Sequence, residues 1–306
     1  MSDIELEASA LARGFLAVIS ILLVVCGTSG NFLVWYGSVF HSAIKLECCS
    51  RVLITNLALT DIFMILFLYI PLGVTAVTGK WVFGQRFCLT QSVALQVIMC
   101  FEIFIMMSLN CYRLWAVKKT KGDREKVKPW HVQLYLIVML VISFSSLVVH
   151  YFLAGRQLDA GLLSQVGLCS LLANRNTVQK LVVLGYMVPP LVISIIASKV
   201  LKCILCHAAH RAGTKNSKSQ RAISLVCWAM IISYLPTYMA IIWEVFSSSV
   251  PNEMYIVLPM IMSINLLVNP AIYFYYNTTF RAFVVNLFSL RMLRHATLPS
   301  DTTESK

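Results

Sequence analysis

Two carboxylates lie inside stretches of sequence that are otherwise apolar, which makes them the first candidates for a functional site. Asp61 and Glu102 are each flanked on both sides by long apolar stretches. An ionisable group in an apolar medium is costly, so such residues mark functional sites by default. Two carboxylates in one low-dielectric site cannot both ionise cheaply, so one must be protonated or a cation must lie between them. The pattern predicts a sodium- or proton-sensitive switch, and a hydrogen-bonded polar plug is the alternative.

Helix geometry places other polar residues at the same depth as the two carboxylates. At about 1.5 Å of rise per residue, Asp61 lies about 15 Å from Arg51 and Glu102 about 16 Å from Arg113. Three amides fall at a similar depth: Asn31, Asn265 and Asn269. Polar groups at one depth in several helices are hard to explain unless they meet inside a bundle. We therefore expect all five residues to form one intramembrane site, with sodium as its only candidate cofactor.

The elements that position these residues are apolar segments long enough to span a bilayer. The chain has 306 residues, of which 58% are hydrophobic and 12% charged. A soluble domain carries about 25% charged residues, so this chain has too little polar surface for a globule in water. About 20 apolar residues form one transmembrane helix. Seven segments qualify: Phe15–Phe40, Val52–Thr78, Cys88–Val117, Val132–Leu153, Val178–Cys206, Ala222–Phe246 and Met254–Tyr276. The sequence predicts an all-α membrane protein with a seven-transmembrane helix bundle.

An amphipathic segment follows the last span. From Thr279 to Leu290 the apolar residues recur at helical spacing, which is typical of a short helix that lies on the membrane surface. We therefore divide the chain into four parts. These are an extracellular N-terminus (1–14), the seven-transmembrane bundle (15–276), the amphipathic surface helix (277–290) and a cytoplasmic tail (291–306).

The formal net charge of +12 is concentrated in particular loops. Basic residues gather between spans three and four, between spans five and six, and after span seven. Loops rich in lysine and arginine face the cytoplasm, so the N-terminus is predicted outside and the tail inside. Basic loops at a membrane surface interact with anionic lipids, which accounts for the positive net charge. This distribution argues against nucleic acid as a partner.

Two cysteines fall in the predicted outer loops. Cys88 lies at the mouth of span three, and Cys169 lies in the loop before span five. Disulfides persist on the extracellular side of a membrane, so these two cysteines are predicted to form a bridge.

Several motifs recur in a fixed order along these spans. They are Gly30-Asn31, Asn56-Leu57-Ala58-Leu59-Thr60-Asp61, Trp81-Val82-Phe83-Gly84 before Cys88, Arg113 at 25 residues after Cys88 (113 − 88 = 25), and Asn269-Pro270-Ala271-Ile272-Tyr273. Across nearly the whole chain the sequence resembles the rhodopsin-like family of G-protein-coupled receptors. This resemblance implies a plasma-membrane receptor that passes an extracellular signal to a heterotrimeric G protein, and to arrestin, rather than an enzyme.

The resemblance also implies which residues act in signalling. In the family, helix kinks at proline let span six swing outward and open a cytoplasmic cleft. The matching coupling and switch residues here are Tyr112, Arg113, Tyr234, Pro236, Pro270 and Tyr273.

Several of these positions depart from the family pattern. Tyr112 stands where the family has the acidic neighbour of the arginine, and we expect Arg113 to be less restrained and basal activity to be raised. Tyr234 stands where the family has a tryptophan, and Ser198 where it has a tyrosine. Glu102 replaces a serine that faces Asp61, and span four lacks its central tryptophan.

A ligand site is expected in the outer half of the bundle, by resemblance. The candidate residues are Leu95, Gln96, Met99, Tyr238, Ile241, Tyr255 and Ser263. Leu95 stands where amine receptors have an aspartate, and Ser263 where opsins have the retinal lysine. These substitutions favour a peptide, a neutral or lipid-like small molecule, or constitutive activity without a ligand.

Two other functions remain open. The altered motifs also fit a receptor-like scavenger or heteromer partner that no longer signals. Intramembrane carboxylates would suit a proton-coupled transporter, although no internal repeat or pair of broken helices supports it.

Overall fold

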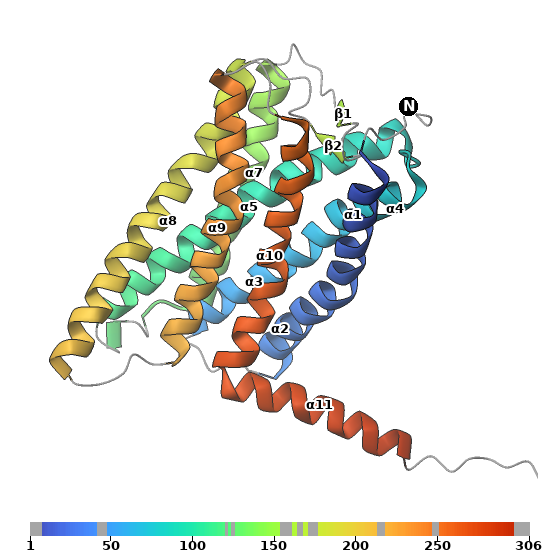
Figure 1. The fold of residues 1–306 in the computed structure, drawn as a ribbon. Coiled ribbons are helices and arrows are strands. Elements are labelled where there is room, and N and C mark those ends of the chain that lie inside the picture. The colour runs from blue at the N-terminus through green and yellow to red at the C-terminus, as the bar shows by residue number, and fades with distance from the viewer. Residues whose placement is uncertain are drawn as a thin grey trace, which may run out of the picture.

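The computed structural model describes residues 8–41, 48–119, 122–123, 126–153, 161–163, 168–170, 177–212, 218–246 and 251–296. Seven helical segments within these ranges are long and apolar enough to cross a membrane. They stand side by side as one bundle (Figure 1). Helices suit this environment because each satisfies its own backbone hydrogen bonds where water is absent. The predicted seven-helix architecture is confirmed.

The first two spans are interrupted by short π-helical turns. Span one consists of α1 (Ala10–Leu22), η1 (Leu23–Gly27) and α2 (Thr28–Phe40). Span two consists of α3 (Cys48–Met64), η2 (Ile65–Tyr69) and α4 (Ile70–Thr78). The other helices are α5 (Gly84–Lys118), α7 (Pro129–Leu153), α8 (Thr177–Ala212), α9 (Lys218–Phe246), α10 (Asn252–Tyr276) and α11 (Thr278–Ala296).

Most helices begin earlier than the apolar segments predicted. The first span begins at Ala10 rather than Phe15, and the second at Cys48 rather than Val52. Hydropathy marks the stretch that needs lipid, whereas a helix continues into the interface as long as its backbone stays paired. For the same reason α11 continues to Ala296, past the predicted end at Leu290.

A short hairpin in the loop before span five was not predicted. Strands β1 (Gly161–Leu163) and β2 (Leu168–Ser170) pair antiparallel, with Leu162 opposite Cys169. Strands of three residues show no clear alternation in sequence, so hydropathy and periodicity could not reveal them.

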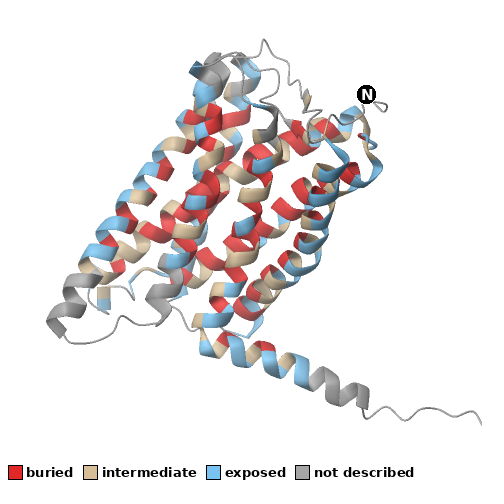
Figure 2. Cartoon of the chain, in the orientation of Figure 1, coloured by how far each residue is buried: buried red, intermediate tan, exposed pale blue. Residues whose placement is uncertain are grey.

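The third span is the central element of the bundle. Helix α5 contacts α3, α7, α8, α9 and β2. Buried residues face inward between the helices, and exposed residues face outward (Figure 2). Many exposed side chains are large and apolar, among them Val141 and Ile232. This outward apolar surface suits a lipid solvent rather than water.

Two small features fix how the seventh span meets its neighbours. A Cβ atom on Gly30 would lie 2.8 Å from Pro270 Cγ, so α2 and α10 approach too closely for a larger residue.

At the start of α11, Asn277 Oδ1 accepts a hydrogen bond of 3.1 Å from the Phe280 amide. Phe280 is buried against the bundle, which attaches α11 to it. That α11 lies on the membrane surface stays a prediction.

Candidate functional site

The two intramembrane carboxylates are neighbours in the centre of the bundle. Asp61 on α3 and Glu102 on α5 are both fully buried, each with an exposed fraction of 0%. Two asparagines four residues apart on α10 connect them, since Asn265 bonds to Glu102 and Asn269 to Asp61. The depth estimate from sequence therefore agrees with their position, since two helices of different direction bring them to one point.

Glu102 is held by two hydrogen bonds from two other helices. The Tyr234 hydroxyl on α9 donates to Glu102 Oε2 at 2.5 Å. The Asn265 amide on α10 donates to Glu102 Oε1 at 3.0 Å. One carboxyl group on the central helix thus connects the sixth and seventh spans.

Asp61 has a different arrangement of partners. Asn269 Nδ2 on α10 donates to Asp61 Oδ2 at 3.0 Å. Asp61 Oδ1 is buried and accepts no hydrogen bond from any of the described residues, and the same is true of Asn265 Oδ1 and Asn269 Oδ1. A buried acceptor without a donor is costly. Three such oxygens beside two carboxyl groups fit a hard cation, which prefers oxygen ligands. They fit a protonated carboxyl group as well.

Asn31 shares the depth of this centre but bonds elsewhere. Its amide donates to Gly27 O at 3.0 Å and to Leu266 O at 2.9 Å. It makes no hydrogen bond to either carboxylate in the part of the chain that the structure describes. Asn31 therefore connects the first span to the seventh, next to the close contact between Gly30 and Pro270.

The residues expected to act as switches occupy different surroundings. Tyr234 contacts Glu102 as described, and Pro236 lies two residues further inside α9. Pro270 directly follows Asn269 inside α10, and Tyr273 is buried one turn beyond it. Tyr112 and Arg113 lie near the predicted cytoplasmic end of α5, and both are partly buried.

A second polar cluster, between α5 and α8, was not predicted. Asn110 Nδ2 donates to Ser194 Oγ at 2.5 Å, and Ser198 Oγ donates to Asn110 Oδ1 at 2.8 Å. All three side chains are buried. The sequence offered one signal for it, since Ser198 is where the receptor pattern has a larger polar residue.

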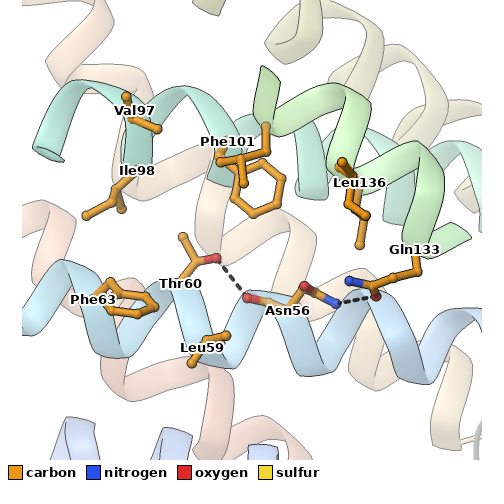
Figure 3. Close-up of a pocket in the computed structure, with 11 residues that line it drawn as sticks. Asn56, Leu59, Thr60, Phe63, Val97, Ile98, Phe101, Gln133 and Leu136 are labelled. Atoms are coloured by element: carbon orange, nitrogen blue, oxygen red, sulfur yellow. Dashed lines mark hydrogen bonds between the residues drawn. The ribbon is translucent and has the colours of Figure 1, made fainter. Parts of the chain in front are cut away.

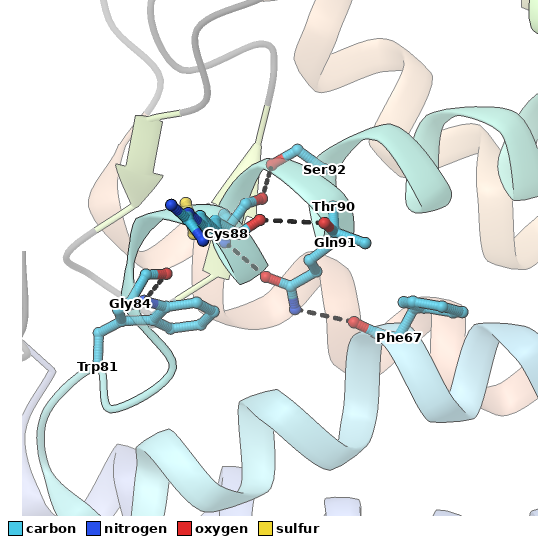
Figure 4. The surroundings of a disulfide bond; sticks show 9 residues. Phe67, Trp81, Gly84, Cys88, Thr90, Gln91 and Ser92 are labelled. Carbon is cyan, nitrogen blue, oxygen red and sulfur yellow. Dashed lines mark hydrogen bonds between the residues drawn. A yellow bond between two sulfur atoms is a disulfide. The ribbon is translucent and has the colours of Figure 1, made fainter.

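The disulfide between Cys88 and Cys169 is present, with Cα atoms 5.2 Å apart. Gln91 supports it from α5: its amide donates to Phe67 O at 2.8 Å and its Oε1 accepts from the Cys169 amide at 3.3 Å (Figure 4). The buried Trp81 donates to Gly84 O at 3.0 Å beside the bridge. These contacts hold strand β2 over the N-terminal end of α5.

The candidate ligand residues lie on α5, α9 and α10. The Tyr238 ring stacks on Tyr234 with centroids 6.1 Å apart, and the buried Tyr238 hydroxyl has no hydrogen-bond partner within the described ranges. Gln96 donates to Ser146 Oγ at 3.0 Å, and Ser263 donates to Met260 O at 2.6 Å. Leu95 and Ile241 are buried, Met99 is half-buried, and the side chain of Tyr255 lies outside the described residues. Their role in ligand binding stays a prediction.

A comparison with models of protein families shows which family has these features. The family model described as "7 transmembrane receptor (rhodopsin family)" matches residues 30–273. The chain belongs to this receptor family. The match covers most of the chain and includes every residue of the buried polar centre, so the protein is a rhodopsin-family receptor and not an enzyme.

Individual relatives of this receptor are distant. Over 253 residues it is 21% identical to the melatonin receptor type 1B of Rattus norvegicus, covering 78% of this chain and 68% of the relative. It is 25% identical over 298 residues to the trace amine-associated receptor 7e of Rattus norvegicus, and this match covers 90% of this chain and 81% of the relative. It is 26% identical over 146 residues to the high-affinity lysophosphatidic acid receptor of Xenopus laevis, and this match covers 46% of this chain and 37% of the relative.

Proposed function

We propose that this receptor carries an extracellular signal to a heterotrimeric G protein through an outward movement of α9. The observation that supports this most directly is the joint at Glu102, where Tyr234 from α9 and Asn265 from α10 bond to one carboxyl group on α5. A change in this joint would alter how α9 packs against α5. Pro236, inside α9, interrupts the backbone hydrogen bonding of that helix and provides a place to bend.

We also propose that the polar centre binds a sodium ion or holds a shared proton. Asp61, Glu102, Asn265 and Asn269 would supply the oxygen ligands, and sodium would supply positive charge between the two carboxyl groups. The three buried oxygens that accept no hydrogen bond in the described part of the chain support this proposal. Either occupant would relieve the cost of burying two carboxyl groups together.

The proposed ligand is a peptide or a neutral or lipid-like small molecule, with activity in its absence as the third option. Leu95 supports this choice, because an apolar residue there offers no counter-charge to an amine. The receptors for melatonin, lysophosphatidic acid and trace amines among the relatives differ in the ligands that their names give, so they do not narrow this choice.

G-protein activation by the full chain, reconstituted in lipid vesicles without ligand, tests the proposal. We expect nucleotide exchange above the background of empty vesicles, and a fall to background in Arg113→Ala. Arg86→Ala, which removes an exposed arginine at the opposite end of α5, should retain the signal. Background exchange in the unmodified protein and in every variant, across a panel of G proteins, would contradict raised basal activity.

The second candidate is a receptor-like scavenger or heteromer partner without signalling. The altered residues at Tyr112 and Tyr234 favour it over an unrelated function. Internalisation of bound ligand without nucleotide exchange would distinguish it from a signalling receptor. A proton-coupled transporter, the least favoured alternative, would instead move a labelled solute across proteoliposomes in response to a pH gradient.

A further inference from the structure

The buried side chain of Asn110 is shared between two helices. Its Nδ2 donates to Met106 O, one turn earlier on α5, at 3.2 Å and to Ser194 Oγ on α8 at 2.5 Å. Its Oδ1 accepts from Ser198 Oγ, also on α8, at 2.8 Å. An asparagine amide carries two donor hydrogens and one acceptor oxygen, so both donors and the oxygen are paired. The amide is therefore fixed in one orientation, with two bonds from α5 to α8.

These two bonds reach α8 just beyond a pair of consecutive prolines. Pro189 and Pro190 lie inside α8, where proline removes a backbone hydrogen bond and allows a helix to bend. Ser194 and Ser198 follow Pro190 by one and by two turns (194 − 190 = 4; 198 − 190 = 8). Without a bond to α5, this part of α8 could move about the prolines. Asn110 holds the segment that the prolines leave adjustable.

The same part of α8 packs against α9, the helix that we propose to move. Helices α8 and α9 are in contact, and Leu191 and Met230 belong to one buried apolar cluster. Arg113, a proposed coupling residue, follows Asn110 by three residues (113 − 110 = 3), so the two residues are neighbours on the surface of α5. A restraint on α8 at Asn110 therefore acts one turn from the residue that would meet the G protein.

Ser198 is also one of the positions at which this chain departs from the family pattern. The family has a tyrosine there, and a tyrosine hydroxyl, at the far end of a ring, cannot occupy the place of Ser198 Oγ. The short serine side chain keeps its hydroxyl at Asn110 Oδ1. This departure therefore replaces a long polar side chain by a direct bond between α8 and α5.

We propose that Asn110 is a positioning residue for signalling, because its bonds to Ser194 and Ser198 hold the inner half of α8 against α5 and restrain the movement of α9. This inference rests on the proposed G-protein function. Hydrogen bonds between membrane helices shift an equilibrium by about 2.7-fold each on average. Loss of both bonds should therefore raise basal nucleotide exchange about sevenfold.

The test compares Asn110→Leu with the unmodified protein, using the full chain in lipid nanodiscs. Leucine has a similar size without polar atoms, and each serine can bond to a backbone carbonyl of α8 instead. One measurement is basal nucleotide exchange by a G protein. The other is the distance between spin labels at two exposed positions, Lys118 on α5 and Lys202 on α8. We expect the rise in exchange together with longer and more broadly distributed distances.

A control variant breaks an amide hydrogen bond that involves neither α8 nor α9. Gln133 Oε1 on α7 accepts a bond of 3.4 Å from Asn56 Nδ2 on α3, beside a groove of about 230 Å³ between α3, α5 and α7 (Figure 3). Gln133→Leu removes this bond and should leave both measurements unchanged.

A second set of variants removes the same contact from the other side. Ser194→Ala combined with Ser198→Ala should reproduce the effect of Asn110→Leu. The triple variant should show no further rise, because residues that share one contact are not additive. A triple variant whose effect is the sum of the two would show that these residues act separately and would overturn the proposal.

Unchanged distances in Asn110→Leu would also overturn the positioning role, whatever the exchange rate. The same holds for a lower thermal midpoint without a rise in exchange when the unmodified protein is active, since such a contact only stabilises the fold. Longer distances with background exchange in every variant, the unmodified protein included, would support the positioning of α8 by Asn110 and contradict the proposed G-protein function instead.

Discussion

The Tyr234 hydroxyl donates to Glu102 Oε2 at 2.5 Å, and this bond joins the sixth span to the third in the fully buried centre of the bundle. Neither residue is the one that the family pattern places at its position. Together they form a contact between a carboxyl group and a phenol at the point where α5, α9 and α10 meet. The movement of α9 that we propose for signalling has to break or rearrange this contact.

Removing the Tyr234 hydroxyl is predicted to raise basal signalling. In Tyr234→Phe the ring still fills its space, but Glu102 Oε2 loses the hydrogen bond that it accepts from α9. Loss of a buried hydrogen bond shifts an equilibrium by about 1 kcal/mol or more, so basal nucleotide exchange should rise about fivefold. Tyr275→Phe, which changes an exposed tyrosine on α10, is the matched control and should signal as the unmodified protein does. A basal rate no higher than that control would rule out a restraining role for the bond.

Sodium is predicted to stabilise the protein through Asp61. In sodium chloride the thermal midpoint of the purified receptor should be higher than in choline chloride of the same ionic strength, because a ligand that binds the folded state stabilises it. Asp61→Asn keeps the shape of the side chain and removes its charge, and it should abolish the difference. A midpoint that does not respond to sodium in the unmodified protein would instead support a shared proton between Asp61 and Glu102.

Gly30→Ala is predicted to destabilise the bundle. The added Cβ atom would lie 2.8 Å from Pro270 Cγ and 2.9 Å from Pro270 Cβ, so α2 and α10 would have to separate. Overpacking of this kind costs about 1–3 kcal/mol. Gly14→Ala, where nothing lies within 4 Å of the added atom, is the control. Thermal unfolding of both variants in detergent measures the effect, and equal midpoints would show that the two helices do not meet as closely as described.

Loss of the disulfide is predicted to lower stability and to release the outer loop. Cys169→Ser removes a bridge that closes a loop between residues 81 positions apart in sequence, which typically costs about 2–4 kcal/mol. Cys26→Ser changes an exposed free cysteine and should leave the thermal midpoint unchanged. Protease susceptibility of the loop should increase only in the first variant. If both variants behave alike, the bridge contributes nothing to holding β2 over α5.

Hydropathy alone could not reveal several features of the site. The hairpin of β1 and β2 was not predicted, because strands of three residues show no clear alternation in sequence. The cluster of Asn110 with Ser194 and Ser198 was not predicted either, because it joins side chains of α5 and α8 that are far apart in sequence. Apolar periodicity reports which residues avoid water, and in lipid nearly every face of a helix is apolar, so it says little about which faces meet.

By itself the sequence determined the seven spans, the cysteine pair and the common depth of Asp61 and Glu102, because a helix advances a constant distance per residue and a bilayer has a constant thickness. Only the tertiary structure decided the partners at that depth. It directs Tyr234 and Asn265 to Glu102, Asn269 to Asp61, and Asn31 to the backbone of α10 instead. The reason is that the rotation of each helix about its own axis follows from packing against its neighbours, and depth carries no information about that rotation.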